Sequence, residues 1–361
     1  MRVRIDGSAF VGKKNFSGVG QYSKLLYEAM SKKHDVDIVT GPFNSTSRVA
    51  LFLNQIYRKL SSFHSMPYFD IFLKPVDLTL FPNFATWPEM KSKYKIVTIH
   101  DLTYLYFPEF IEKKNLSYLK RVIPASIKRA DYILTVSETV KDELVKEFNI
   151  QSDKCLVTYV PPDMMYYEEQ KNNCDLHLKY GTPKNKYILF VGNLEPRKNL
   201  SCLIKAYQSL DKKIKSEYKL VIAGNKGWNL DILTDTPLNE DSNNIILTGF
   251  VDSLDMPNLY RQAAIFVMPS LYEGFGIPIL ESMASHTPVI TSDIPVLRET
   301  GGKAALYFDP KNPTDLGEKI KSLLINKKLQ NKLVRLGDDN INRFSWDDNV
   351  EKIVNLINLN G

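Results

Sequence analysis

Two carboxylates flank a pair of glycines in the segment of this chain that most clearly suggests chemistry. Glu273 follows the apolar run Ala264–Met268, which has the composition of a buried strand. Gly274 and Gly276 come next, and a helix that contains Glu281 is expected to begin near the second glycine. Bare N–H groups at a helix start, together with the positive end of the helix dipole, bind anions such as phosphate.

The spacing of the second carboxylate fits a nucleotide. Glu281 lies roughly 7–8 Å along the helix axis from Gly276, comparable to the distance between a phosphate and its ribose. A carboxylate accepts two hydroxyl hydrogen bonds well, so Glu281 suits a ribose diol. Glu273 could then meet the group attached to the far phosphate, and ribose, diphosphate and sugar together describe a nucleotide sugar. The same turn is also typical of an ordinary strand–helix connection, and the segment alone leaves both interpretations open.

A pair of adjacent cations follows another buried strand. Arg197 and Lys198 come shortly after the apolar run Tyr187–Val191, where the turns of a parallel sheet carry functional residues. A diphosphate leaving group gains negative charge as its bond to a sugar breaks, and fixed cations stabilise that charge without a metal. The alternative is two solvated loop charges, which is the usual interpretation of such a pair in isolation.

The first half offers two weaker candidates. His100 ends an apolar strand and could present a ring nitrogen to a sugar hydroxyl or a reacting centre, although such histidines are more often structural. Gly18 and Gly20 open a helix and offer backbone amides to an anion. Ser23 occupies the third glycine position of a dinucleotide fingerprint, and no P-loop motif exists. No metal site is expected, because the remaining histidines lack metal-ligand spacing: His34, His64, His177 and His286.

The composition is that of a two-domain globular protein. The 361 residues are 43% hydrophobic and 24% charged, and this length exceeds one ordinary core. Three separated cysteines suggest neither disulfides nor zinc, and neither a signal peptide nor a membrane-spanning run is evident. We therefore expect a cytoplasmic location. The net charge of +6 lies in the first half, since residues 1–165 hold 23 Lys and Arg against 17 Asp and Glu. That surplus could meet an anionic membrane surface or only maintain solubility, and no nucleic-acid motif accompanies it.

Short apolar runs alternate with helical stretches from end to end, which predicts parallel sheets covered by helices. We expect an N-terminal domain of residues 1–165, a second domain of residues 166–344, and a last helix, 345–361, with Ser345 as its N-cap. The polar stretch Glu168–Lys186 is interpreted as a linker. The predicted strands are Val3–Asp6, Val36–Thr40, Leu78–Phe81, Ile96–His100, Tyr132–Val136, Leu156–Val160, Tyr187–Val191, Leu220–Ala223, Ile245–Leu247, Ile265–Met268, Val289–Thr291 and Ala305–Phe308. The predicted helices before the last are Val19–Ser31, Val49–Ser61, Lys114–Lys128 and Val140–Phe148.

Six segments of the second half, in the same order, resemble the nucleotide-binding half of the retaining glycosyltransferases of family 4, also called glycosyltransferase group 1. The first half matches more loosely, through the Gly18 turn, residues 99–101 and residues 135–138. The six segments are Val191–Asn199, Val221–Trp228, Thr248–Val251, Glu273–Glu281, Thr287–Ser292 and Ala304–Pro310.

The resemblance implies a GT-B fold, in which two Rossmann-like doubly wound α/β domains face each other across a cleft and the last helix crosses back to the first domain. It implies a retaining, metal-independent transfer with no cofactor besides the nucleotide-sugar substrate. Carried over to this chain, it implies that the catalytic residues are His100, Glu273, Arg197 and Lys198. The implied donor-binding residues are Gly18, Asn193, Arg197, Lys198, Phe250, Glu273, Gly274, Phe275, Gly276, Ile277 and Glu281.

In the implied mechanism the acceptor hydroxyl attacks from the face that the diphosphate leaves, and the leaving phosphate takes the proton. A covalent intermediate on an enzyme carboxylate is the alternative, and no such carboxylate can be assigned. Ser17 stands where the family often has a first glycine, which weakens the assignment of Gly18. The segment Arg48–Leu60 has an apolar face with cations at its ends and is either a membrane-surface helix or an ordinary core-facing one.

The resemblance suggests an acceptor and a donor. The acceptor is expected to be a lipid-linked saccharide in bacterial surface-polysaccharide assembly, and the donor GDP-mannose, with UDP-hexoses or a deoxyhexose donor as alternatives. Two other classes of protein remain as alternatives. A GT-B sugar-nucleotide epimerase would share the fold, and a non-catalytic module that binds nucleotide sugars would share the binding residues.

Overall fold

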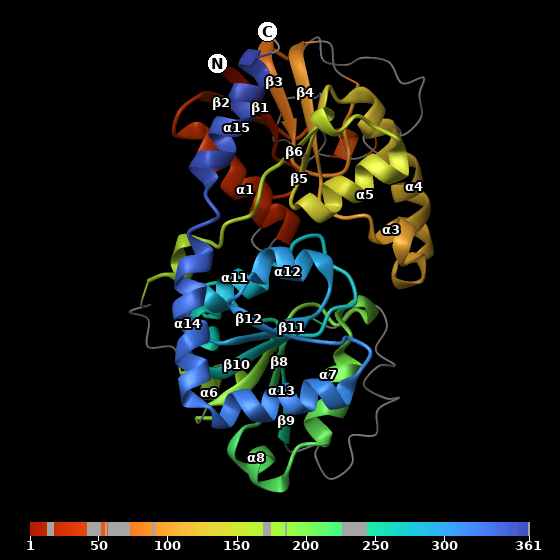
Figure 1. Cartoon of the computed structure of the whole chain (residues 1–361). Coiled ribbons are helices and arrows are strands. Elements are labelled where there is room, and N and C mark those ends of the chain that lie inside the picture. The colour runs from red at the N-terminus through yellow and green to blue at the C-terminus, as the bar shows by residue number, and fades with distance from the viewer. Residues whose placement is uncertain are drawn as a thin grey trace. The chain divides into compact units, whose positions relative to one another are not determined.

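The structure is a computed structural model, and it divides into two compact units (Figure 1). One unit comprises Met1–Val160 with Ser345–Gly361, and the other comprises Pro161–Phe344. The structure describes residues 1–12, 18–41, 52–54, 56, 73–88, 91–168, 175–184, 186–225 and 244–359.

Each unit contains a parallel sheet of six strands. The first has the order β2-β1-β3-β4-β5-β6 and the second the order β12-β11-β10-β7-β8-β9. The strands of the first sheet are β1 (Arg2–Asp6), β2 (Asp35–Val39), β3 (Val76–Phe81), β4 (Ser92–Ile99), β5 (Tyr132–Thr135) and β6 (Cys155–Val157). Those of the second are β7 (Tyr187–Val191), β8 (Leu220–Ala223), β9 (Ile245–Gly249), β10 (Ala263–Met268), β11 (Val289–Ser292) and β12 (Ala305–Phe308).

Helices connect the strands, as a parallel sheet requires. In the first unit, α15 packs against α1. In the second, α13 packs against α7, and α11 packs against α14. The helices of the first unit whose bounds the structure describes are α1 (Gly18–Ser31), α3 (Thr103–Tyr106), α4 (Lys113–Arg129), α5 (Glu138–Phe148) and α15 (Trp346–Leu359). Those of the second are α6 (Leu176–Tyr180), α7 (Leu200–Gln208), α8 (Lys212–Glu217), α10 (Met256–Gln262), α11 (Ile277–Ala284), α12 (Pro295–Gly301), α13 (Pro313–Ile325) and α14 (Lys327–Ile341).

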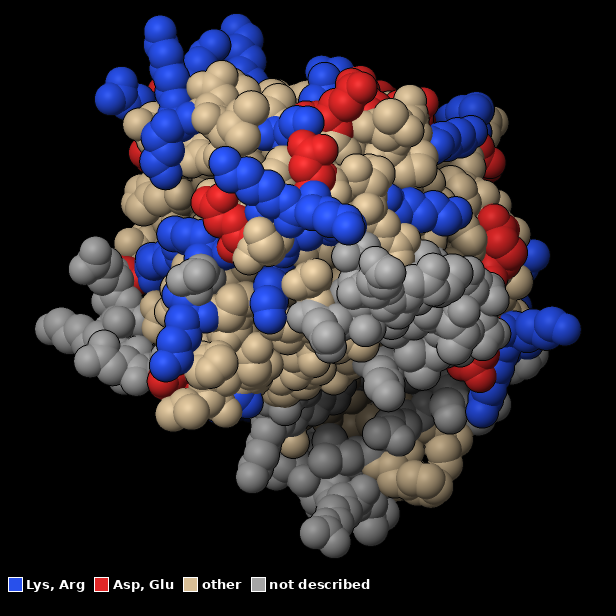
Figure 2. All heavy atoms as spheres, turned by 90° about the horizontal axis from the view of Figure 1, so that it is seen from below, with Lys and Arg blue, Asp and Glu red and all other residues tan. Residues whose placement is uncertain are grey.

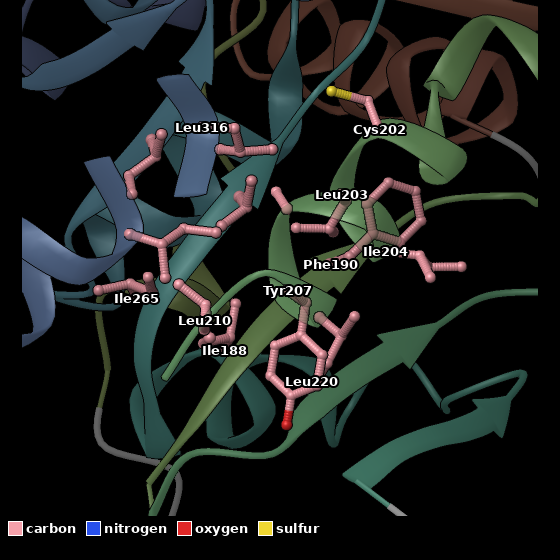
Figure 3. Packing of buried hydrophobic residues seen from close by; sticks show 14 of the residues in the cluster. Ile188, Phe190, Cys202, Leu203, Ile204, Tyr207, Leu210, Leu220, Ile265 and Leu316 are labelled. Carbon is pink, nitrogen blue, oxygen red and sulfur yellow. The ribbon is translucent and has the colours of Figure 1, made fainter. Parts of the chain in front are cut away.

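The core of the second unit shows why apolar strands alternate with helices along the sequence. In β7, Ile188 and Phe190 face α7 and meet Leu203 and Tyr207 (Figure 3). All four side chains are almost fully buried. Burying each such side chain contributes about 1.5–3 kcal/mol, so this packing fixes the position at which β7 ends and its loop begins.

The predicted fold class is confirmed, and so are most predicted elements. The observed bounds of β7, β8 and β12 equal the predicted ones. The last helix belongs to the first unit as expected. Its start is capped by Ser345, whose Oγ accepts a 3.2 Å hydrogen bond from the backbone N–H of Asp348. The side chain of Asn349 also donates to the carbonyl oxygen of Tyr159 at 2.6 Å, which attaches α15 to the end of the first unit's other segment.

The linker prediction for Glu168–Lys186 is wrong in part, because α6 lies within it. The carboxylate of Asp175 accepts hydrogen bonds from the first turn of α6, and Gly181 ends the helix in the left-handed region. These capping residues are short and polar, so the composition of the stretch resembled that of a loop. The helix predicted for residues 49–61 lies outside the described residues except for positions 52–54 and 56.

The sequence also predicts cysteines without disulfides and no membrane-spanning segment. Cys155 and Cys202 are free and buried, whereas Cys174 lies outside the described residues. Of the helices that the structure describes, none combines the length and the hydropathy needed to cross a bilayer.

Candidate functional site

The strand order of the second sheet defines where its site lies. The chain leaves β7 toward β8 and β9, then returns to β10 beside β7 before it continues to β11 and β12. Such a reversal leaves a crevice between the loops that follow the two neighbouring strands. The loop after β7 carries Arg197 and Lys198, and the loop after β10 carries Glu273.

Glycines let the loops after β7 and β8 approach each other closely. Gly224 has φ +153°, and a Cβ at this position would lie 1.9 Å from the carbonyl oxygen of Gly192. Only glycine fits such a contact. The chain then forms the short 3₁₀ helix η5 (Pro196–Lys198), which begins with the fixed φ of Pro196.

Asn199 connects the loop after β7 to two other loops. Its φ is +55°, a left-handed conformation that asparagine adopts more readily than most residues. Its side-chain amide donates to the carbonyl oxygens of Pro269 at 3.0 Å and Pro310 at 2.8 Å. The backbone N–H of Leu271 also donates to the carbonyl oxygen of Arg197 at 2.8 Å. These bonds hold the cations in register with the loop after β10.

Arg197, Lys198 and Glu273 form an ion cluster between these two loops, in which Lys198 and Glu273 are buried and Arg197 is partly buried. Nη1 of Arg197 lies 2.8 Å from Oε2 of Glu273, and Nζ of Lys198 lies 2.6 Å from Oε1 of the same carboxylate. Glu273 is 7% exposed and Lys198 8%. Nε of Arg197 contacts Glu195 at 3.0 Å, so this guanidinium bridges two carboxylates. The structure thus brings together three of the four predicted catalytic residues.

The cluster is ionised at neutral pH. Burial alone would raise the pKa of Glu273, but Arg197 and Lys198 lower that pKa to about 2. Burial and the neighbouring Arg197 lower the pKa of Lys198, and Glu273 offsets this only in part. The lowered pKa of Glu273 favours its charged form and hence the ion pair, whereas the lowered pKa of Lys198 favours the neutral amine and opposes the pair. The pair nevertheless holds, because Arg197 keeps the carboxylate ionised and a carboxylate 2.6 Å from Nζ retains the proton on the amine.

Helix α11 begins where the sequence predicts. Gly276, with φ +99°, immediately precedes it, and a Cβ there would meet Leu297 at 2.8 Å, so the turn requires glycine. No side chain caps this helix start. Pro278 has no N–H, which leaves Ile277 as the first helical donor. Phe275 is buried and packs edge-to-face against Phe344, so it supports the turn and offers a ligand only its backbone.

Glu281 lies farther along α11 and is partly buried. Its Oε2 accepts a 2.9 Å hydrogen bond from the hydroxyl of Tyr260 in α10. The hydroxyl of Tyr166 also lies near this carboxyl and lowers its pKa. Burial raises the pKa of Glu281 to about 7, although both tyrosines lower it. This carboxylate can accept further hydroxyl hydrogen bonds, as a ribose diol would require.

The two other predicted donor-binding residues of this unit are exposed. The side-chain amide of Asn193 lies 3.5 Å from Glu195. Phe250 directly follows β9, at the same edge of the sheet, and is 44% exposed. An exposed aromatic ring at this edge is available to a ligand.

His100 and Gly18 belong to the first unit. His100 lies one residue beyond β4, and its Nε2 is 3.0 Å from the carbonyl oxygen of Pro82, so this nitrogen carries the proton. The rings of Tyr22 and Phe84 pack edge-on against it. Burial lowers the pKa of His100, so the ring is neutral and offers a ligand only an acceptor at Nδ1. Gly18 is the exposed first residue of α1, and Ser17 lies outside the described residues.

Four residues of this site had no role in the sequence prediction. Glu195 and Asn199 lie within a matched segment, and their positions beside the cations could have indicated a supporting role. Tyr166 and Tyr260 lie in segments with no site motif, and nothing in their spacing from Glu281 indicates the contact. Within the part of the chain that is described, no three His, Cys, Asp or Glu side chains gather closely enough to hold a metal ion.

Comparisons with known proteins agree with this geometry. The model of Glycosyltransferase Family 4 matches residues 16–163, and that of Glycosyl transferases group 1 matches residues 176–338. O-antigen chain mannosyltransferase B of Escherichia coli is 31% identical over 280 residues, which cover 77% of this chain and 73% of that protein. O-antigen chain mannosyltransferase RfbU of Salmonella typhimurium is 32% identical over 264 residues, which cover 72% and 68%.

Solved structures share the fold. WaaG, a glycosyltransferase involved in lipopolysaccharide biosynthesis, superposes with a TM-score of 0.68 at 15% identity and covers 99% of both chains. Anabaena Alr3699/HepE, solved with UDP and glucose, superposes with a TM-score of 0.69 at 15% identity and 99% coverage of both chains. Two parallel doubly wound units form the GT-B fold, and in this chain a cation pair lies at the strand-order reversal of the second unit. The chain belongs to the glycosyltransferases of group 1 and family 4, and it is a glycosyltransferase.

Proposed function

We propose that this glycosyltransferase moves a hexose from a nucleotide sugar to a saccharide acceptor in bacterial surface-polysaccharide assembly, with retention of the anomeric configuration. The observation that supports a nucleotide sugar as the donor is the ion cluster of Arg197, Lys198 and Glu273 in the loops after β7 and β10. A cation pair beside the start of α11 suits a diphosphate. A buried carboxylate joined to those cations suits the hydroxyls of the attached sugar.

Mannose from GDP-mannose is the proposed donor group. The support is that both relatives above are named O-antigen chain mannosyltransferases. The acceptor is proposed to be a lipid-linked saccharide. UDP-hexoses and a deoxyhexose donor are the alternatives, since HepE was solved with UDP and glucose.

The proposed chemistry uses the cluster as a preorganised site for charge. When the donor binds, Arg197 and Lys198 contact its phosphate oxygens while Glu273 contacts sugar hydroxyls. The bond from the anomeric carbon to the diphosphate oxygen breaks, and the acceptor oxygen bonds to the same face of that carbon. The acceptor's proton passes to the leaving phosphate oxygen. Because Glu273 already orients both cations, little reorganisation is needed as the diphosphate gains charge.

Glu281 is proposed to bind the ribose, and His100 to accept a hydroxyl hydrogen bond at Nδ1. Phe250 is proposed to stack on the base. Backbone N–H groups near Gly18 and the start of α11 complete the donor contacts. The neutral state of His100 excludes it as a strong acid at neutral pH, so its role is orientation rather than protonation of the leaving group.

A donor panel tests the proposal. Purified protein is incubated with GDP-mannose, UDP-glucose and dTDP-rhamnose, with and without a lipid-linked saccharide acceptor, and nucleoside diphosphate release is measured. We expect acceptor-dependent release with GDP-mannose, and a product linkage with the anomeric configuration of the donor by NMR. Release with none of the donors would contradict the proposal and favour a non-catalytic binding module. A free nucleotide sugar with altered stereochemistry would indicate an epimerase.

We further propose that the first unit meets an anionic membrane surface where the lipid-linked acceptor is held. Helix α4 carries six Lys and Arg residues and no acidic residue. On the face shown in Figure 2, by contrast, basic side chains are spread among acidic and uncharged ones. Liposomes with anionic lipid should sediment the wild-type protein but not the variant with Lys113→Glu, Lys114→Glu and Lys120→Glu. The control, Lys328→Glu with Lys332→Glu in α14, should bind as wild type; equal binding by all three would contradict this proposal.

A further inference from the structure

The carboxyl group of Glu281 is held in place from outside its own helix. The hydroxyl of Tyr260, from α10, donates to Oε2 at 2.9 Å, and the hydroxyl of Tyr166 lies close enough to lower the pKa of the same carboxyl. Tyr166 is 6% exposed and Tyr260 is fully buried. A glutamate side chain has three rotatable bonds, so these two hydroxyls restrict the direction in which its free lone pairs point.

Tyr166 is itself fixed by two contacts. It belongs to the 3₁₀ helix η4 (Met164–Tyr166), near the start of the second unit. Its ring packs edge-to-face against the ring of Tyr260 at 5.9 Å between centroids. Its carbonyl oxygen accepts a 2.7 Å hydrogen bond from Nη2 of Arg261, the residue that follows Tyr260. The hydroxyl of Tyr166 therefore has little freedom to leave the carboxyl group.

We infer that Tyr260 and Tyr166 are positioning residues for donor binding, which orient the Glu281 carboxylate toward the ribose hydroxyls of the nucleotide. This inference rests on the proposed function, because it takes Glu281 as the ribose ligand. Neither tyrosine needs to touch the donor. Both act on the ionised carboxylate through their hydroxyls, which a phenylalanine lacks although it would fill nearly the same space.

The same contacts make donor binding depend on pH. The titratable groups that act on Glu281 are Tyr260 from α10, Tyr166 from η4 and Asp163 just before η4. Burial raises the pKa of the carboxyl to about 7, the tyrosines lower it, and Asp163 raises it. An ionised carboxylate accepts two ribose hydroxyls, whereas a protonated one loses part of its acceptor capacity. Donor affinity should therefore fall as the pH drops through about 7.

Removing one tyrosine hydroxyl should move this transition to higher pH. A hydrogen bond to a charged group corresponds to about one pKa unit. At pH 7 the ionised fraction of Glu281 would fall from about one half to about one tenth, so affinity should weaken about fivefold. At pH 9 the carboxylate is ionised in both proteins, and the two affinities should differ by less than about twofold.

The experiment measures GDP and UDP affinity by titration calorimetry between pH 6 and pH 9. The proteins are wild type, Tyr260→Phe, Tyr166→Phe and Glu281→Gln. We expect both Phe variants to bind more weakly near pH 7 and to approach wild-type affinity near pH 9. Glu281→Gln should bind weakly with no transition in this range. Melting temperatures by circular dichroism identify any variant that has lost its fold, and the two Phe variants are independent of each other.

The outcomes separate this inference from the function beneath it. Wild-type affinity and an unchanged pH midpoint in both Phe variants would overturn the inference alone. Weaker binding by the same factor at every pH would also overturn it, because that result indicates packing rather than an effect on the carboxylate. Wild-type protein that binds neither nucleotide would overturn the proposed function, and the inference with it.

Discussion

Replacing Glu273 by Gln should destabilise the second unit by an amount that the structure predicts. The substitution keeps the shape of the side chain but leaves the buried Lys198 without its carboxylate. The pKa of Glu273 falls from 4.5 to about 2 in the folded protein, and each pKa unit corresponds to about 1.4 kcal/mol. We therefore expect the free energy of unfolding to decrease by about 3 kcal/mol at pH 7, within the range for breaking a buried ion pair.

The pH dependence identifies the cause. Because the pKa of Glu273 is lower in the folded than in the unfolded protein, its contribution to stability is complete well above pH 4.5 and is lost as the pH falls toward 2. The difference between wild type and Glu273→Gln should thus narrow by roughly 1 kcal/mol between pH 7 and pH 4. Urea unfolding followed by circular dichroism at both pH values measures this difference.

A matched control is available at the other carboxylate of the cluster. Glu195 also contacts Arg197, but its side chain is 24% exposed, so Glu195→Gln should cost less than about 1 kcal/mol. Glu273→Gln protein that unfolds at the wild-type urea concentration would refute the reasoning. A deficit of the same size at pH 4 would also refute it, since that result would indicate a packing defect instead of a lost charge interaction.

Three other substitutions test the loops of the site. Lys198→Met should lower kcat by at least about 100-fold, because a cation that stabilises the negative charge of the leaving diphosphate is lost, and circular dichroism should show that the variant is folded; wild-type turnover would exclude the role. Asn199→Ala removes two hydrogen bonds to loop carbonyl oxygens and should lower the free energy of unfolding by about 2–3 kcal/mol in chemical denaturation, so a neutral result would contradict the described contacts. Gly224→Ala should prevent soluble expression because its Cβ would clash with Gly192, whereas Gly249→Ala, with φ +68° and open space around it, should express and lose only about 1–2 kcal/mol.

The two loops of the candidate site could be predicted because each directly follows a strand. The apolar runs of β7 and β10 end abruptly at polar and glycine-rich segments, and this change of pattern is local in sequence. For the same reason Gly276 was correctly expected to begin a helix. The short helix α6 was missed, since its five residues are too few to display a helical period.

The contacts within the site could not be predicted from spacing. Glu273 lies 75 residues from Lys198 in the sequence, and only the pairing of β7 with β10 brings them together. Parallel strands that are buried on both faces are almost uniformly apolar, so their sequences indicate where a strand lies but not which strand is its neighbour. The tyrosines that hold Glu281 were missed for a related reason, because a hydroxyl inside a packed core leaves no periodic signal.

By itself the sequence determined the alternation of strands and helices, the family, and the residue types available at the end of each strand. These properties depend on local polarity, on glycine and proline, and on short motifs. The tertiary structure alone decided that Arg197 and Lys198 share one carboxylate, that His100 is a neutral acceptor, and that Glu281 is held by two tyrosines. Charge states and hydrogen-bond partners depend on burial and on neighbours distant in sequence, which exist only once the chain has folded.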